Sequence, residues 1–439
     1  MNNNRLYLIL GGGIVILVMV TLVLTLRGFG GGGAARANLT FWGVFDDRNT
    51  FERVIANYKA LYPGVSVNYR AFAFEDYERN LIDALAAGSG PDIIMIHNTW
   101  LPKHQDKLKP APDQLPGEDN KFFTKAEYQS QFVEVANQDL VRGNDIYGFP
   151  LYVDTLALFY NRDIFNNEGI TAPPRTWDDF NQYIQALTKY NSNGSIDLAG
   201  AAIGTAKNIN RSSDILMAMM IQSGAQMTNN INTVSTFSNP VNGEPVGERA
   251  LEYYTNFADP RSQAYTWNDS LNYSIDAFIE GKAVMMLNYS HQIPIVRAKA
   301  ARLNFAVAPM PQADPNFSKT YANYWAASVS NKSPNYLEAW RFLRYLTSRD
   351  GSIAYLNESM RPAARKDVIE LQKNDIDLGL FALQALTAKS WYQADSEGIE
   401  RIFADMIDTV NAGRLNTRDA LRDAEAKVNV LMSKQNDDF

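Results

Sequence analysis

The chain has 439 residues, with 41 Lys and Arg, 48 Asp and Glu, 3 His and no Cys, so its formal net charge is -7. The absence of cysteine excludes disulfides, thiol nucleophiles, Cys-ligated metal centres and a lipid-modified cysteine, and three histidines leave little for a multi-histidine metal site. The acidic balance without a basic tract excludes nucleic acid as the expected partner, and at about 100–200 residues per domain the length predicts two or three domains.

The N-terminal segment differs in composition from the rest of the chain. Residues 6–26 carry no charge and are bracketed by Arg5 and Arg27. A helix of this length spans about 30 Å, which is the thickness of a bilayer core. The apolar region of a cleavable signal is usually shorter, about 7 to 15 residues, although residues 35–37 offer a small-residue cleavage pattern. We therefore expect an uncleaved transmembrane helix and a glycine-rich tether, with cleavage near Ala37 as the alternative.

The next 60 or so residues alternate between strand and helix patterns. This order predicts a parallel sheet covered by helices, and in such sheets ligands bind at the carboxyl ends of the strands. The strands are expected at residues 39–42, 65–69 and 93–96, and the helices at residues 51–62 and 77–87.

Further elements follow in the second and last thirds of the chain. Residues 147–160 are β-rich but interrupted by Pro150, and Thr176 stands where it caps a helix. Helices are expected from residue 177 to 187 and at residues 215–221, 250–257, 275–280, 336–347 and 397–432, the last with a break at 413–416, and strands at residues 283–287 and 305–308.

Five short motifs together resemble one known family. In their order and spacing they resemble the extracellular solute-binding proteins of ABC importers, sugar-binding group, which includes the maltodextrin-binding protein. Each motif is weak alone, whereas five in the family's order are specific, and the resemblance covers nearly everything from residue 39 to 432. The motifs lie at residues 89–95, 147–163, 174–180, 278–285 and 339–351.

The resemblance implies a two-lobed α/β fold, the periplasmic-binding-protein (Venus-flytrap) fold, after an anchor and tether over residues 1–37. By this resemblance residues 38–153 and 326–373 form the N-lobe, and residues 154–325 and 374–435 form the C-lobe. The ligand is held in the cleft between the lobes, and hinge bending closes it. A ligand that contacts both lobes stabilises the closed state only through contacts that are absent from the open state.

The resemblance also implies an extracytoplasmic receptor that binds a mono- or oligosaccharide and delivers it to the membrane subunits of an ABC permease. We expect a monomer with no cofactor and no metal, held at the extracytoplasmic face of the cell membrane by residues 6–26. If the chain is cleaved near Ala37, the protein is secreted or periplasmic instead. The alternative is a receptor of the same fold for peptides, polyamines or metals, or a sensor.

Candidate ligand-binding residues follow predicted strands or occupy motif positions. Sugars are bound by aromatic faces and by planar polar side chains, and each neutral hydrogen bond contributes about 0.5–1.5 kcal/mol net. The candidates are Phe45, Asp46, Asp47, Asn98, Trp100, Asp154, Asn288, Tyr289, Ser290, Tyr324, Trp325 and Trp391.

Each candidate has a structural alternative. Asp46 or Asp47 is equally suited to capping the following helix, and Asp154, at the position of a sugar-binding acid of the maltodextrin-binding protein, is otherwise a structural acceptor near a hinge. His97 is more typical of a solvated loop. His291 stands where the maltodextrin-binding protein has an aromatic residue, which leaves the substrate open.

A surface glycosidase is the rival function. Such an enzyme needs two carboxylates about 5–10 Å apart across the scissile bond. The pairs Asp46-Asp47 and Asp178-Asp179 are adjacent in sequence and seldom converge on one bond, and the second pair belongs to a helix start. No G-x-S-x-G, H-E-x-x-H or P-loop motif is present. The sequence therefore favours a receptor over an enzyme.

Overall fold

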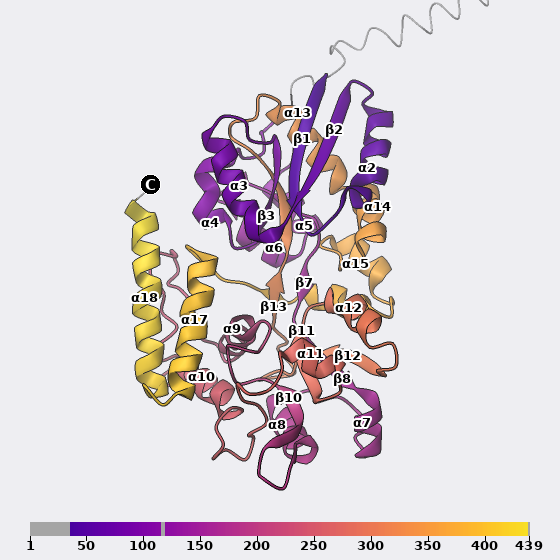
Figure 1. Cartoon of the computed structure of the whole chain (residues 1–439). Helices are drawn as coiled ribbons and strands as arrows, with labels where there is room; N and C mark the ends of the chain where they lie inside the picture. Colours follow the sequence, from indigo (N-terminus) through magenta and orange to yellow (C-terminus); the bar gives the residue numbers. More distant parts are fainter. Residues whose placement is uncertain (1–35, 116–118, 438–439) are drawn as a thin grey trace, which may run out of the picture.

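The computed structural model describes residues 36–115 and 119–437, and these form two lobes, each built on a five-stranded sheet (Figure 1). The expected two-lobed α/β fold is confirmed. The anchor expected at residues 6–26 lies outside the described residues. Within the described residues, no helix combines the length and the hydropathy that a membrane span requires.

The N-lobe sheet has the strand order β2-β1-β3-β14-β6. β1 pairs in parallel with β2 and β3, whereas β14 is antiparallel to β3 with Trp325 opposite His97. The strands are β1 (Ala37–Val44), β2 (Val65–Phe72), β3 (Ile93–His97), β6 (Phe149–Pro150) and β14 (Trp325–Val329).

Helices cover both faces of this sheet, with α3 and α4 on one side and α2 and α14 on the other (Figure 1). Phe41 on β1 meets Phe51 on α2 with ring centroids 5.1 Å apart, and Phe51 meets Tyr69 on β2 at 4.4 Å. The helices are α2 (Arg48–Leu61), α3 (Phe74–Ala86), α4 (Leu101–His104), α5 (Lys125–Gln131), α6 (Glu134–Leu140), α13 (Tyr336–Leu346), α14 (Arg349–Ser359) and α15 (Lys366–Gln372). A 3-10 turn (Gln105–Lys107) follows α4, and the hairpin β4 (Val141–Arg142) and β5 (Asp145–Ile146) follows α6.

The C-lobe sheet has the order β12-β8-β11-β10-β9 and mixes parallel and antiparallel pairs. Its strands are β8 (Ala157–Asn161), β9 (Lys189–Tyr190), β10 (Ile196–Ala202), β11 (Ala283–Asn288) and β12 (Phe305–Pro309). Its helices are α7 (Arg162–Asn167), α8 (Trp177–Leu187), α9 (Ser212–Gln222), α10 (Val246–Asn256), α11 (Ser274–Ile279), α12 (Gln292–Lys299), α16 (Gly379–Ala385), α17 (Ser396–Asn411) and α18 (Thr417–Asp437).

Three segments connect the lobes. A small sheet of β15 (Ala388–Lys389), β13 (Thr320–Asn323) and β7 (Asp154–Thr155) lies between the two larger sheets, and Figure 1 shows β7 and β13 at the waist of the molecule. β6 leads into β7, β13 leads into β14, and α16 leads through β15 into α17. We call these three stretches the crossing segments. Because both hydrophobic cores are closed by residues from distant parts of the chain, neither lobe is a continuous sequence.

Helix starts follow the sequence signals. Asp47 caps α2 by accepting a hydrogen bond from the Thr50 backbone N–H at 3.0 Å. Thr176 and Asp179 form a reciprocal capping box at α8, as the Thr-x-x-Asp spacing predicts. Each such cap typically contributes about 1 kcal/mol to stability.

Candidate functional site

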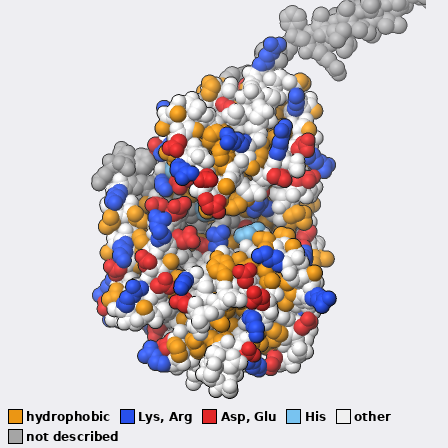
Figure 2. Space-filling model, viewed as in Figure 1, with side chains coloured by type: hydrophobic (Ala, Val, Ile, Leu, Met, Phe, Trp, Pro, Cys, Tyr) orange, Lys and Arg blue, Asp and Glu red, His pale blue; other side chains and the backbone are white. Residues whose placement is uncertain are grey.

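The space between the lobes is bounded by the ends of strands from both sheets, and Figure 2 shows a hollow there with a histidine in view. On the N-lobe side lie the ends of β1 and β3 and the start of β14. On the C-lobe side lie the end of β11 and the start of α9. Asn323, at the end of β13, links the two walls, because its Oδ1 is 3.4 Å from His97 Nε2 while its side chain hydrogen-bonds Asp214.

The N-lobe wall carries an exposed aromatic pair. Phe45 follows β1 in the left-handed conformation (φ 64) and is 59 % exposed, and Phe74 at the start of α3 is 46 % exposed. Their rings stack with centroids 5.4 Å apart, and both meet the edge of Trp325, at 5.8 and 6.3 Å. Trp325 itself is buried, so it supports the pair from beneath. Two exposed aromatic faces are thus held on a rigid base.

His97 lies beside this aromatic group as a neutral side chain. Its ring meets Trp325 at a centroid distance of 5.5 Å, and its Nδ1 is 2.7 Å from Thr99 Oγ1. Burial, with a smaller contribution from the charge of Arg211, lowers the pKa of His97 to about 4 against the opposing effect of a hydrogen bond to Asn323. A neutral imidazole presents one donor and one acceptor to the cleft.

The C-lobe wall carries Arg211, which the sequence did not single out. It precedes α9 in the left-handed conformation (φ 65), and its guanidinium lies 5.6 Å from the Tyr289 ring centroid. Its Nε is buried and has no hydrogen-bond partner among the described residues. A left-handed non-glycine residue and an unpaired buried donor each destabilise the fold, and such features are concentrated at functional sites.

Two carboxylates stand near Arg211. Asp214 accepts a hydrogen bond from the Tyr289 hydroxyl at 2.8 Å; burial raises its pKa, while Arg211 acts to lower it. Burial and the charge of Asp214 raise the pKa of Glu400, which projects from α17. The group therefore offers one strong donor and two carboxylate acceptors to whatever occupies the cleft.

The first candidate carboxylates have structural partners in the N-lobe. Asp46 is buried and forms an ion pair with Arg361 (2.9 Å) and a hydrogen bond with the Tyr355 hydroxyl (2.7 Å). Asp47 is exposed and caps α2 through the Thr50 N–H. The alternative of helix capping therefore describes Asp47, and Asp46 fixes the turn that presents Phe45.

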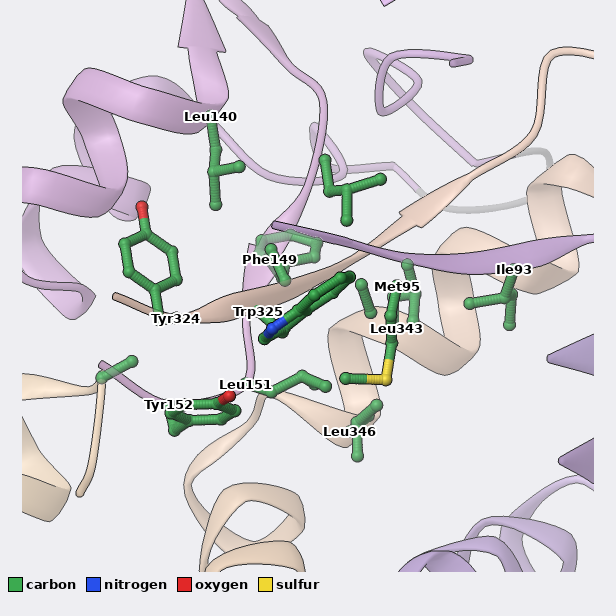
Figure 3. Packing of buried hydrophobic residues seen from close by; sticks show 14 of the residues in the cluster. Ile93, Met95, Leu140, Phe149, Leu151, Tyr152, Tyr324, Trp325, Leu343 and Leu346 are labelled. Atoms are coloured by element: carbon green, nitrogen blue, oxygen red, sulfur yellow. The ribbon is translucent and has the colours of Figure 1, made fainter. Parts of the chain in front are cut away.

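Three further candidates do not reach the aromatic pair. Two of them, Asn98 and Tyr324, point away from it, and Trp100 lies beneath it. Asn98 Nδ2 donates to Asp139 on α6 at 3.1 Å, and the Tyr324 hydroxyl donates to the same carboxylate at 2.8 Å. Figure 3 shows the Tyr324 ring directed toward Leu140, on the same helix as Asp139, whereas Trp325 points elsewhere. Trp100 is buried against Trp325 at a centroid distance of 5.1 Å.

The C-lobe candidates form a supporting layer around one buried carboxylate. Asp154 accepts hydrogen bonds from the Ser290 backbone N–H (3.0 Å) and hydroxyl (2.8 Å), and His291 Nδ1 lies 3.8 Å away. Tyr289 stacks on His291 at 6.1 Å, and the fully buried Asn288 donates through Nδ2 to Asn210 at 3.1 Å. These contacts hold the turn after β11, and of this turn His291 is the side chain that reaches solvent, at 38 % exposure.

Ten of the twelve sequence candidates are buried. Trp391 is among them, and its Nε1 lies 3.1 Å from Met217 Sδ. The side chains nearest the open cleft are instead those of Phe45, Phe74, His97, Arg211 and His291. Phe74 had a signal in the sequence, because it follows the second parallel strand as Phe45 follows the first. Arg211 had none.

Comparison with protein families identifies the family. A family model described as "Bacterial extracellular solute-binding protein" matches residues 42–353. Among curated proteins, a binding protein of Brucella abortus is 25 % identical over 401 residues, covering 88 % of this chain and 90 % of that protein. The maltotriose-binding protein of Pyrococcus abyssi is 24 % identical and covers 71 % of this chain and 62 % of that protein.

Solved structures have the same fold. A cyclo/maltodextrin-binding protein complexed with maltotetraose has a TM-score of 0.73 at 19 % identity, covering 91 % of this chain and 97 % of that one. An ABC transporter solute-binding protein of Thermotoga lettingae bound with alpha-D-tagatose has a TM-score of 0.68 at 23 % identity, covering 91 % and 100 %. At these identities the likeness establishes the architecture.

Proposed function

The chain belongs to the bacterial extracellular solute-binding protein family, and from this premise we propose that it is the receptor of an ABC importer and binds a mono- or oligosaccharide between its lobes. The observation that carries the proposal is the exposed Phe45–Phe74 stack on the N-lobe side of the space between the lobes, whose C-lobe side carries the Arg211 group. Relatives named for maltotriose and maltodextrin support the same ligand class.

The chemistry of the two walls suits a polyhydroxylated ligand. The apolar face of a sugar ring packs on the exposed aromatic faces, and the Arg211 guanidinium donates to a hydroxyl oxygen. Asp214 and Glu400 accept from hydroxyl groups. A hydrogen bond that involves a charged group contributes about 1.5–3 kcal/mol and a neutral one about 0.5–1.5 kcal/mol, so a few such contacts and one stacked ring reach micromolar affinity.

A receptor role is supported over glycoside hydrolysis by the positions of the carboxylates first considered for catalysis. Asp47 and Asp179 cap helices, and Asp46 is ion-paired with Arg361. General acid and nucleophile roles need carboxylates that face one bond from two sides. These three carboxylates stabilise the fold instead.

Calorimetric titration of the full-length chain in detergent tests the proposal. We expect saturable binding of a sugar from a panel of maltodextrins, other oligosaccharides and monosaccharides, with amino acids and polyamines in parallel. Ligand at one hundred times its dissociation constant adds about 2.7 kcal/mol to the free energy of unfolding, so a thermal-shift screen identifies candidates first. Stabilisation by an amino acid or polyamine alone contradicts the sugar assignment.

We also propose that residues 6–26 anchor the protein, as a monomer, at the extracytoplasmic face of the membrane, where it meets its permease. The length and charge-free composition of this segment support the proposal. Intact-mass measurement of the protein from its native membrane decides between an anchored chain and one cleaved near Ala37. A mass that begins near residue 37 contradicts the anchor.

A further inference from the structure

A second hollow lies between the lobes and is not part of the cleft described above. We call it the rear cavity. It has a volume of about 380 Å³, within the range of about 300–1,000 Å³ that is typical of small-molecule sites. Its walls come from α4 and α6 in the N-lobe, from the loop after α9 and the start of β13 in the C-lobe, and from the crossing segment at residues 389–393.

Side-chain directions place the rear cavity on the opposite side of the crossing segments from the aromatic pair. His97 faces Trp325, whereas its neighbour Asn98 faces Asp139, which lines the rear cavity. Tyr324 likewise bonds Asp139. The two ends of α9 likewise lie on different sides. Arg211 directly precedes the helix at the cleft, whereas Ile221 in the last turn of the helix lines the rear cavity, about 15 Å further along the helix axis.

The rear cavity is positively charged, although the chain as a whole is acidic. Three cationic residues line it, Arg142, Lys319 and Lys389, against Asp139 as the single acidic residue in its lining. Strand pairing sets Tyr321 of β13 opposite Lys389 of β15, and Lys319 lies two residues before Tyr321, so the two lysines come from adjacent segments at the waist of the molecule.

The charge of Asp139 offsets that of Arg142, whereas among the described residues no acid forms an ion pair with Lys319 or Lys389. Arg142 donates to the backbone carbonyls of Gln138 (2.9 Å) and Val141 (3.2 Å), and Lys319 Nζ donates to the carbonyl of Ile221 (3.1 Å). Within the residues that the structure describes, Lys389 forms neither a hydrogen bond nor an ion pair through its ammonium group.

Asp139 offsets one of these three positive charges at neutral pH, and the two lysines leave the lining net positive. Its two oxygens accept hydrogen bonds from Asn98, Tyr324 and Ser390, and burial raises its pKa to about 6, so this offset is lost at mildly acidic pH. Amide and hydroxyl side chains complete the lining. They are Gln138, Gln226, Thr228, Asn230 and Asn232.

We propose that the rear cavity binds a small multivalent oxyanion, either inorganic phosphate or a small organic molecule that carries a phosphate group. Lys319 and Lys389 supply ammonium donors to its oxygens, and the amides bind the remainder of the molecule. An anion neutralises the positive charge of the two lysines, and charge-assisted hydrogen bonds are the strong ones in such a site. This site is separate from the sugar site and does not depend on the proposed function.

Titration calorimetry of the full-length chain at constant ionic strength tests the site, with inorganic phosphate, glycerol 3-phosphate and neutral glycerol as probes. We expect one-to-one saturable binding of at least one phosphate probe and none of glycerol. Binding of glycerol 3-phosphate in preference to phosphate identifies an organic ligand, and the reverse order identifies the free ion. Because no sugar is present, the result is independent of whether the protein binds saccharides.

Substitutions locate the binding. Lys389→Gln and Lys319→Gln are each expected to weaken the anion at least about tenfold, whereas Lys332→Gln, an exposed lysine of the N-lobe outside the rear cavity, leaves the affinity unchanged. Unaltered melting temperatures of the variants confirm that they fold. Absence of saturable binding up to about 10 mM of both phosphate probes, or binding that neither lysine variant weakens, overturns the proposal.

Discussion

The two sides of the crossing segments differ in chemistry although the same short peptides build both. On the cleft side, Phe45 and Phe74 expose aromatic faces and Arg211 keeps an unpaired donor. On the rear side the lining is cationic and amide-rich, with Trp391 and Tyr392 as its aromatic residues. His97 ends β3 beside Trp325, whereas the next residue, Asn98, donates to Asp139 of the rear lining. A residue's place at a strand end therefore does not tell which of the two sides it serves.

The largest expected effect concerns the base of the cleft side. Trp325→Ala removes a buried indole, so we expect the free energy of unfolding to fall by about 3–5 kcal/mol, as measured by urea denaturation. The same change removes the support beneath Phe45 and Phe74 and abolishes the stabilisation by sugar. Trp340→Ala, an equally buried tryptophan of the N-lobe core, serves as the control: it loses similar stability and keeps the sugar effect. Equal sugar effects in both variants contradict the assignment.

Arg211→Gly tests ligand binding at the C-lobe wall. The change leaves Asp214 and Glu400 without their nearby cation, which lowers stability, and glycine recovers part of that loss because it tolerates the left-handed φ of 65. Loss of the charged donor weakens sugar about 10- to 100-fold in calorimetry. Asn232→Gly, a left-handed position that lines the rear cavity, is the matched control and leaves the sugar affinity unchanged. If the two variants bind sugar equally well, Arg211 does not contact the ligand.

Asp139 gives the rear side a pH dependence. Its folded pKa of about 6 is above the usual value of 3.8 for an aspartate, so the folded protein holds a proton that the unfolded chain releases. Its contribution to stability is present below about pH 4 and is lost as the pH rises through 6, on the order of 2 kcal/mol. Urea denaturation from pH 4 to 7 measures this loss. Asp139→Asn is expected to remove this pH-dependent loss of stability, whereas Asp145→Asn, at an exposed position, is expected to retain it. If the stability of wild type and of Asp139→Asn changes equally with pH, Asp139 is not its source.

The smallest expected effect is at the exposed surface of the cleft. Phe45→Ala removes one stacking face and is expected to weaken sugar about tenfold or less, with stability nearly unchanged because the ring is largely exposed. Phe317→Ala, an even more exposed phenylalanine in the loop before β13, is expected to have no effect on affinity. Calorimetry on both variants compares them directly, and an unaltered affinity in Phe45→Ala removes this ring from the site.

Much of the fold is predictable because local signals agree with the tertiary structure. The alternation of strands and helices from β1 to β3 and the break between α17 and α18 follow from apolar spacing and turn residues. The helices α12 and α14 were not singled out by spacing, since Pro294 and Gly351 lie inside them and weaken any helical signal.

The site is less predictable, for a physical reason. The loops that follow strands must satisfy their own polar groups, so Asp46, Asn98 and Asp154 bond protein partners before any ligand. Arg211 is placed by a left-handed turn between a strand and a helix, and no periodic pattern encodes that conformation. Such a residue is found from its unpaired donor, which is visible only in three dimensions.

The placement of β14 has a consequence for synthesis. β3 pairs with β14 in the N-lobe sheet, yet 228 positions separate His97 from Trp325. At roughly 5–20 residues per second, a ribosome takes about 10 to 45 s to cover that interval. Throughout this time β3 has one unpaired edge, which is a template for aggregation. The nascent chain therefore depends on a chaperone or on prompt export, and its yield is expected to be sensitive to translation rate.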